Sequence, residues 1–147
     1  MTSTDHVRRG HRLLQLGVLL FLLGLLVGLA VPSLANPRMG LASHMEGVMN
    51  GLFLIGLGLL WERLSLSDRL QSIAFWLAVY GTFANLAATF LAAAWAAGGM
   101  MPLAGQGRVG GASQEALISG LLVSLALADI AVCVLVLAGL RRAPASA

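Results

Sequence analysis

The chain consists of four long apolar runs separated by short polar connections. Each run contains about 20 residues with few charges, the length that an α-helix needs to cross the hydrocarbon core of a bilayer. The pattern predicts an all-α protein, built as a bundle of four transmembrane helices. The runs are residues 13–34, 40–61, 70–97 and 114–140.

The first run has a signal peptide as its alternative interpretation. Three arginines precede it, and residues 33–35 (Ser-Leu-Ala) resemble a cleavage site. Because the apolar run is too long for a typical signal-peptide core, we interpret it as the first membrane span.

The composition agrees with a membrane protein. Hydrophobic residues make up 59% of the chain and charged residues 10%, whereas soluble domains contain about 25% charged residues. A four-helix bundle uses most of the length, so we expect a single integral membrane domain over residues 1–147. The chemistry of this protein must then lie within or close to the bilayer.

The nine basic residues are all arginines and predict the topology. If both termini lie on one side, seven arginines share that side and two lie opposite, which by the positive-inside rule places both termini in the cytoplasm. We therefore expect a multi-pass protein of a bacterial-type inner membrane. Since these arginines occupy short loops and tails, we expect the lipid bilayer and no nucleic acid as their surroundings. The two outer arginines are Arg38 and Arg108.

The longest connection, GGMMPLAGQGRVGGAS at residues 98–113, is rich in glycine. Glycines give it the freedom to fold over a site as a lid, but a flexible linker is the more common meaning of such a composition. We favour the linker.

The second run contains the stretch GLASHMEGVMNG, with His44, Glu46 and Asn50 among glycines. A polar side chain in hydrocarbon costs several kcal/mol unless it is paired or faces a cavity, so these residues predict a functional site. Glu46 and Asn50 are four residues apart and share one helix face. Asn85 and Thr89 likewise share a face of the third run, and both sets lie in the outer half of the membrane.

These polar faces suggest one pocket between helices. The face of the fourth run that carries Glu115 and Ser119 could join this pocket, and Tyr80 is a possible donor. The alternative is that hydroxyl and amide groups bridge neighbouring helices, which we favour for Thr82, Ser119 and Ser124. We assign Asp129 to structure, paired with a basic terminus or Gln15. The expected aromatic lining is Phe53, Phe83, Phe90 and Trp95.

His44 lies on a different face of the same helix, which it shares with Gly40, Gly47, Gly51 and Gly58. The usual meaning of such a glycine stripe is close helix packing. The second interpretation is a flat prosthetic group that lies against the glycines and is held by an axial bond from the histidine, as haem iron often is.

Other metal sites are poorly supported. A single histidine cannot build a tetrahedral zinc site, and His6 and His11 lie in the distant cytoplasmic tail. Cys133, the only cysteine, excludes a thiolate cluster or an intrachain disulfide, and we expect it to be a buried packing residue. Arg38 and Arg108 could meet haem propionates, but snorkelling to the interface explains them equally well.

Several phrases of the sequence resemble the hydroxylaminobenzene mutase family of small four-span membrane enzymes. They are NPRMGLASHMEGVMNGLFLIGLGLLW, AFWLAVYGTFANLAATFLAAAWAAG, MMPLAG and QEALISGLLVSLALADI, and together they cover most of residues 13–140. The residues that carry the resemblance are His44, Glu46, Asn50, Asn85, Pro102, Gln114 and Glu115. The resemblance implies an isomerase that converts an arylhydroxylamine into the ortho-aminophenol with no net redox change.

A fainter resemblance extends to styrene oxide isomerase, in which a histidine is followed six residues later by Asn-Gly, here His44, Asn50 and Gly51. That resemblance implies a homotrimer with haem b bound by the histidine between protomers, the ferric iron acting as a Lewis acid. The active-site tyrosine of that enzyme falls near Thr89, so this chain departs from it there, and the roles of Tyr80 and Thr89 are open. About 120° separates His44 from Asn50 around the helix, which is compatible with a site between protomers.

We therefore expect a membrane isomerase acting on hydroxylaminobenzene. His44 would bind the metal of the cofactor, with Gly47, Gly51 and Arg38 around it. Asn50 would orient the NHOH group, and Glu46 would move the ring proton or hold His44 by a hydrogen bond. The remaining catalytic candidates are Asn85, Thr89 and Tyr80. The alternatives are a small proton-coupled exporter of aromatic compounds and a structural or quinone-linked haem subunit.

Overall fold

The computed structural model describes residues 3–141, with side chains from residue 6 onward, and in this range it is all-α. Four long helices form the bundle, and each is long and apolar enough to cross a membrane, so the predicted fold class is confirmed. They are α1 (Ser3–Ala30), α2 (Pro37–Leu60), α3 (Asp68–Trp95) and α5 (Ala112–Arg141). Short helical turns connect them, namely η1 (Val31–Ser33), η2 (Trp61–Arg63) and α4 (Pro102–Gly105). The turn α4 lies inside the loop for which the sequence predicted no structure.

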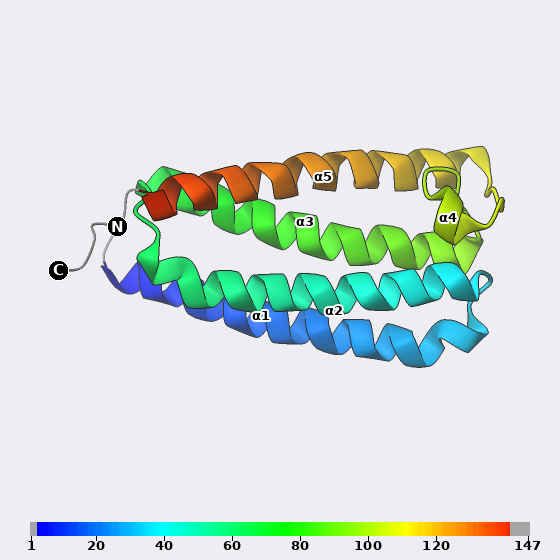
Figure 1. The fold of residues 1–147 in the computed structure, drawn as a ribbon, viewed down its shortest axis with the longest axis horizontal. Helices are drawn as coiled ribbons and strands as arrows, with labels where there is room; N and C mark the ends of the chain where they lie inside the picture. The colour runs from blue at the N-terminus through cyan, green and yellow to red at the C-terminus, as the bar shows by residue number, and fades with distance from the viewer. Residues whose placement is uncertain (1–2, 142–147) are drawn as a thin grey trace.

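The helices alternate in direction along the bundle (Figure 1). The start of α1, the end of α5 and the η2 connection lie at one end, which we call the inner end. The turn η1 and helix α4 lie at the other, outer end. Helix α1 packs mainly on α2 and α5 mainly on α3, and contacts between α2 and α3 join the two pairs.

Local sequence fixes the start of α2 at the outer end. Pro37 occupies its first turn, where its missing N–H removes no helical hydrogen bond. The side chain of Asn36 caps the helix, with its Oδ1 accepting a 3.2 Å hydrogen bond from the backbone N–H of Met39. The first residues of α2, and with them His44 and Glu46, are therefore held at a defined register relative to the loop.

Glycines bring the backbones of α1 and α2 into direct contact. A Cβ added at Gly47 would lie 2.6 Å from the Cα of Gly24, and one added at Gly51 would lie 2.6 Å from the backbone nitrogen of Phe21. Such an approach is open only to residues without a side chain. The glycine stripe of α2 is thus filled by α1, and the close-packing interpretation of the stripe is the one that the structure shows.

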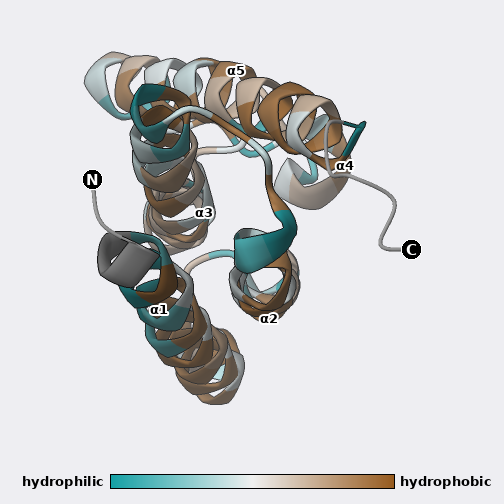
Figure 2. Ribbon diagram, turned by 90° about the vertical axis from the view of Figure 1, so that its left-hand side faces the viewer, coloured by the Kyte–Doolittle hydropathy of each residue, from teal (hydrophilic) through white to brown (hydrophobic). Residues whose placement is uncertain are grey.

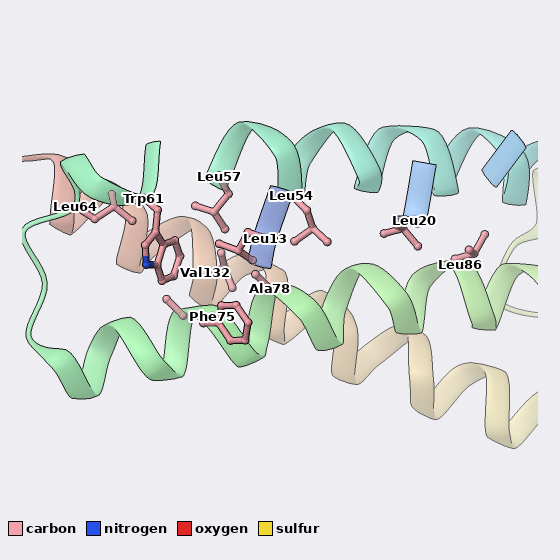
Figure 3. Packing of buried hydrophobic residues seen from close by; sticks show 11 residues of the cluster. Leu13, Leu20, Leu54, Leu57, Trp61, Leu64, Phe75, Ala78, Leu86 and Val132 are labelled. Atoms are coloured by element: carbon pink, nitrogen blue, oxygen red, sulfur yellow. The ribbon is translucent and has the colours of Figure 1, made fainter. Parts of the chain in front are cut away.

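The apolar core is strongest toward the inner end, where residues from all four long helices meet (Figure 3). Trp61 is fully buried there, and its ring packs edge-on against Phe75 with centroids 6.3 Å apart. Leu13 of α1, Leu54 of α2 and Val132 of α5 complete this cluster. The cluster fills this half of the bundle with apolar side chains.

The outer surfaces of the helices are mainly hydrophobic, and hydrophilic residues gather at helix ends (Figure 2). Cys133 belongs to this exposed surface of α5, so the expectation of a buried cysteine is wrong. It lines an apolar groove of about 450 Å³ between α2 and α5, together with Phe53, Gly56, Leu57, Leu60, Val136 and Leu137. The groove exists because α5 packs on α3 rather than on α2.

The close approach of α1 and α2 predicts unequal effects of two identical substitutions in α2. Gly51→Ala places a methyl group against the backbone of α1 and should lower the free energy of unfolding by about 1–3 kcal/mol. Gly56→Ala is the control, because a Cβ at Gly56 meets no atom within 4 Å, and it should leave stability unchanged or slightly higher. Thermal unfolding in detergent measures both, and equal shifts would contradict this packing.

Candidate active site

The centre of the site is a hydrogen bond between α2 and α3. The Nδ2 of Asn85 donates to Oε2 of Glu46 at 2.9 Å, and both side chains are half-buried. An acceptor-only carboxylate inside a membrane protein needs such a donor, since no lipid group offers one. The structure thus brings together Glu46 and Asn85, two residues that the sequence assigned to one pocket.

Thr89 lies one turn outward from Asn85 on the same face of α3. Its hydroxyl contacts the carbonyl oxygen of Asn85 at 2.8 Å and the Oγ of Ser43 in α2 at 3.1 Å. Thr82, which lies inward on this helix, contacts the carbonyl of Ala78 in its own helix at 2.7 Å. Thr89 therefore borders the site and bridges α2 and α3, whereas Thr82 serves only its own helix, as the packing alternative predicted.

A cavity of about 340 Å³ lies directly outward of Glu46. Glu46, Ala42 and Thr89 form its floor and sides, and residues 101–104 form its roof. This roof is α4 with the residue before it, which covers the outer end of the bundle (Figure 1). The volume and the largely apolar lining of this cavity suit a small aromatic molecule. The carboxyl group of Glu46 could form a hydrogen bond with the polar group of such a molecule.

Hydrogen bonds between this loop and the residues at the start of α2 hold the roof in place. Asn36, which is 1% exposed, donates through Nδ2 to the carbonyls of Ala104 and Gly105 at 3.2 and 3.3 Å. Arg38 donates through Nε to the carbonyl of Leu103 at 3.0 Å, and the guanidinium of Arg108 donates to the carbonyl of Ala35. The loop is therefore a bonded cover, and the favoured linker interpretation is wrong.

The start of α5 also serves the loop. Glu115 accepts hydrogen bonds from the backbone nitrogens of Gly99 and Gly110, at 3.1 and 2.8 Å for the closer contacts. Gln114 accepts one from the nitrogen of Gly111 at 2.9 Å. The expected contribution of Glu115 to the pocket is thus wrong, because its carboxyl group is used by the loop backbone.

His44 lies in the seam between α1 and α2. Its Nδ1 is 2.8 Å from the carbonyl oxygen of Gly24, and because a carbonyl only accepts, Nδ1 carries the proton. Gly28 leaves room for the ring, since a Cβ there would lie 2.7 Å from Nδ1. Among the described residues Nε2 has no hydrogen-bond partner. In a neutral imidazole it would keep a lone pair for a metal, the arrangement typical of histidine ligands.

His44 and Glu46 face different sides of α2. Two residues correspond to about 200° around a helix, and accordingly His44 contacts α1 while Glu46 contacts α3. The hydrogen bond between them that the sequence allowed is absent, because Gly24 supplies the partner of the histidine. Gly47 and Gly51 are likewise covered by α1, so within one chain they offer no surface to a flat cofactor.

Asn50 lies on the same face of α2 as Glu46, one turn inward. Its Nδ2 is buried and has no partner among the described residues. A buried donor without an acceptor costs about 1–3 kcal/mol, so this amide marks a position where a ligand or water would be stabilised. The structure therefore agrees with a site at Asn50 without showing what it binds.

The structure separates the other candidates from Glu46. Tyr80 is 42% exposed and forms a 2.6 Å hydrogen bond with Ser124 on the surface of α3 and α5. Phe83 and Phe90 line an apolar cavity of about 460 Å³ between α1 and α3, while Phe53 lines the groove between α2 and α5. The expected aromatic lining of one shared pocket is therefore wrong.

Sequence reasoning underestimated Asp129. Its Oδ1 is buried without a partner in the described residues, and the carboxyl group fills the space beside Gly81, where a Cβ would lie 2.0 Å from Oδ1. It is paired neither with Gln15, which is exposed on α1, nor with a basic residue that the structure describes. The same argument that selected Glu46, a lone carboxyl in an apolar run, would have selected it.

No cluster of three or more histidine, cysteine, aspartate or glutamate residues arranged to hold a metal ion occurs within residues 3–141. A haem iron can be bound by a single protein ligand, and the Nε2 of His44 has the chemistry of such a ligand.

Fold and site together define a four-helix integral membrane protein with a covered polar site in its outer half. The family model for styrene oxide isomerase matches residues 9–141. Hydroxylaminobenzene mutase HabB of Ectopseudomonas oleovorans is 58% identical over 97% of this chain and 87% of its own length. Hydroxylaminobenzene mutase HabA of the same organism is 45% identical over 86% of this chain and 94% of its own length.

The chain belongs to the styrene oxide isomerase family and, within it, groups with the hydroxylaminobenzene mutases. The predicted membership and the predicted class of enzyme, an isomerase, are confirmed. No solved structure matches the chain.

The bonds of Asn36 to the loop predict the effect of Asn36→Asp. This variant keeps the oxygen that caps α2 but loses the Nδ2 donor to Ala104 and Gly105, and two lost hydrogen bonds should raise the open fraction of the loop about tenfold. Trypsin cleavage after Arg108 in detergent should accelerate accordingly. Ser33→Ala, at an exposed position nearby, is the control, and equal cleavage rates in both variants would refute the role of Asn36.

Proposed function

We propose that this protein is a membrane isomerase that converts hydroxylaminobenzene and related arylhydroxylamines into 2-aminophenols by intramolecular transfer of the hydroxyl group. The observation that carries the proposal is the covered cavity of single-ring size in which Asn85 holds the carboxyl group of Glu46. The names of the relatives supply the substrate class.

The reaction moves one oxygen and one proton. The N–O bond breaks, the oxygen bonds to the ortho carbon, and the proton of that carbon ends on nitrogen, so atoms and electrons balance without an external reagent. Glu46 accepts the ring proton as the ring regains aromaticity and returns it to nitrogen. Asn85 fixes the orientation of this carboxylate, and the amide of Asn50 orients the NHOH group.

Exclusion of water is essential, because water would compete with the transferred hydroxyl group for the ring cation. The roof of residues 101–104, held by Asn36 and Arg38, separates the cavity from the outer aqueous phase. The apolar core around Trp61 closes the inner end. Both closures support an isomerase over an exporter, which needs a polar path to each side of the membrane.

We infer that His44 holds haem b through Nε2, an inference supported by the free lone pair and by the rigid seat between Gly24 and Gly28. When bound, the ferric iron supplies a Lewis acid that withdraws charge from the N–O bond. Gly47 and Gly51 do not fit a role beside the cofactor within one chain. Arg38 keeps its terminal nitrogens for a propionate, because only its Nε bonds to the loop.

The positions of His44 and Glu46 support a homo-oligomer. Because they face opposite sides of α2, a site that uses both must be completed by another copy of the chain. The arc of α2 between them carries exposed Leu41, Met45 and Met49, an apolar surface suited to a protomer contact. We therefore propose a trimer with the cofactor between protomers.

We further propose that both termini face the cytoplasm. The start of α1 and the end of α5 lie at the same end of the bundle as Arg63 and Arg69, and the loop with Arg38 and Arg108 lies at the other (Figure 1). The positive-inside rule then places the cavity of Glu46 in the outer half of the inner membrane.

Glu46→Gln tests the proton-transfer role. The amide keeps the shape of the side chain but cannot accept the ring proton, so kcat for hydroxylaminobenzene should fall about 10²–10⁴-fold, with the visible spectrum unchanged. Glu62→Gln, at an exposed position of η2, is the matched control. Turnover of Glu46→Gln within about twofold of that control would contradict this role.

His44→Ala tests the cofactor. The purified variant should lack both the Soret absorption band and turnover, and Gly28→Ala should weaken both by displacing the imidazole ring. Normal turnover by a haem-free His44→Ala protein would reject the haem inference while leaving the isomerase itself intact. An iron that cycles between redox states during turnover would instead favour a quinone-linked haem subunit.

A further inference from the structure

A carboxyl group that the reaction scheme above does not use lies in the middle of the membrane. Asp129 extends from α5 toward α3, and its side chain occupies the space that Gly81 leaves free. Its Oδ1 is buried and has no hydrogen-bond partner among the described residues. An unpaired carboxyl group is costly in hydrocarbon, so a ligand that supplies a partner would be stabilised there.

The register of the helices places Asp129 at the level of Asn50. Helices α2 and α3 run in opposite directions, and Glu46 meets Asn85. Four residues further inward on α2 is Asn50, and four residues further inward on α3 is Gly81, which contacts Asp129. Since both helices rise about 1.5 Å per residue, Asn50 and Asp129 lie at the same depth of the bundle.

The two unpartnered atoms are complementary. The Nδ2 of Asn50 is a donor that lacks an acceptor, and the Oδ1 of Asp129, as a carboxylate oxygen, is an acceptor that lacks a donor. They do not bond to each other. A ligand that carries an oxygen acceptor next to an N–H or O–H donor would satisfy both at once.

The groove between α2 and α5 lies inward of this pair, and neither Asn50 nor Asp129 is among its lining residues. Phe53 and Cys133, which line it, lie one turn inward from Asn50 and Asp129, respectively. Its lining is apolar and its volume is about 450 Å³, enough for a substituted benzene ring. The polar pair and the apolar groove are thus about one helical turn apart, a distance that one substituted ring can span.

We propose that Asp129 and Asn50 form the polar end of a second binding subsite, in which a small aromatic molecule with adjacent N–H and oxygen groups places its ring in the α2–α5 groove. This inference rests on the proposed function for its ligand class. The subsite lies one turn inward from Glu46 and opens toward the bilayer. It therefore gives a membrane-dissolved arylhydroxylamine, or the aminophenol product, a route between lipid and the cavity.

Cys133 provides a direct test, because it is exposed, lines the groove and is the only cysteine of the chain. The purified full-length protein in detergent is labelled with a maleimide, and the labelling rate is followed by mass spectrometry at increasing 2-aminophenol under anaerobic conditions. We expect 2-aminophenol to slow labelling of the wild-type protein. Unchanged labelling at saturation of the enzyme would overturn the subsite.

The variant Asp129→Asn tests whether Asp129 forms the polar end of the subsite. Loss of a hydrogen bond to a charged acceptor should raise the 2-aminophenol concentration for half-protection by about tenfold or more. Ser124→Ala is the control, because it removes the hydrogen bond between α3 and α5 to Tyr80 without touching the groove. It should protect like the wild type. Equal protection in Asp129→Asn and Ser124→Ala would reject the role of Asp129.

A second variant tests the same site in case Asp129→Asn does not fold. Gly81→Ala keeps the carboxyl group but displaces it, since the added Cβ would lie 2.0 Å from Oδ1, and it should also weaken protection. Wild-type protection in Gly81→Ala would contradict the proposal. Turnover is measured separately: turnover without protection rejects the subsite alone, and protection without turnover rejects the proposed reaction alone.

Discussion

A polar side chain in the hydrocarbon layer must find a partner inside the protein, and most of this site follows from how that requirement is met on α2. A lone carboxyl group costs about 3 kcal/mol at that depth, and Glu46 meets the cost in part through the 2.9 Å hydrogen bond from Asn85. That bond sets the register between α2 and α3. The same register brings Ser43 to Thr89 and places Asn50 at the depth of Gly81.

Helix α2 separates three functions by giving each its own face. The glycine face allows α1 to approach so closely that the carbonyl of Gly24 becomes the partner of His44. The polar face turns Glu46 and Asn50 toward α3. The third face is an exposed apolar arc. Close packing of α2 on α1 positions His44. The glycines therefore support the proposed cofactor site by fixing its histidine ligand, and they do not contact the cofactor itself.

The outer loop shows how a glycine-rich segment becomes a fixed cover. Its backbone carbonyls and nitrogens are hydrogen-bonded by Asn36, Arg38 and Glu115, each from the end of a long helix. The loop thus lies over the cavity that Glu46 lines and covers it at this end of the bundle.

The sequence by itself determined the four spans, the all-α class and the family, and it selected His44, Glu46, Asn50 and Asn85 as site candidates, because length, hydropathy and the cost of buried polar groups act locally along the chain. Helical spacing also placed Glu46 and Asn50 on one face. Only the tertiary structure decided which faces meet. It assigned the glycine stripe to α1, Glu115 to the loop, Tyr80 to the outer surface and Asp129 to the space beside Gly81. Those contacts depend on how each helix is rotated about its axis and how deep it lies in the bundle. A helix that is apolar on nearly all sides does not reveal its rotation or its depth in the sequence.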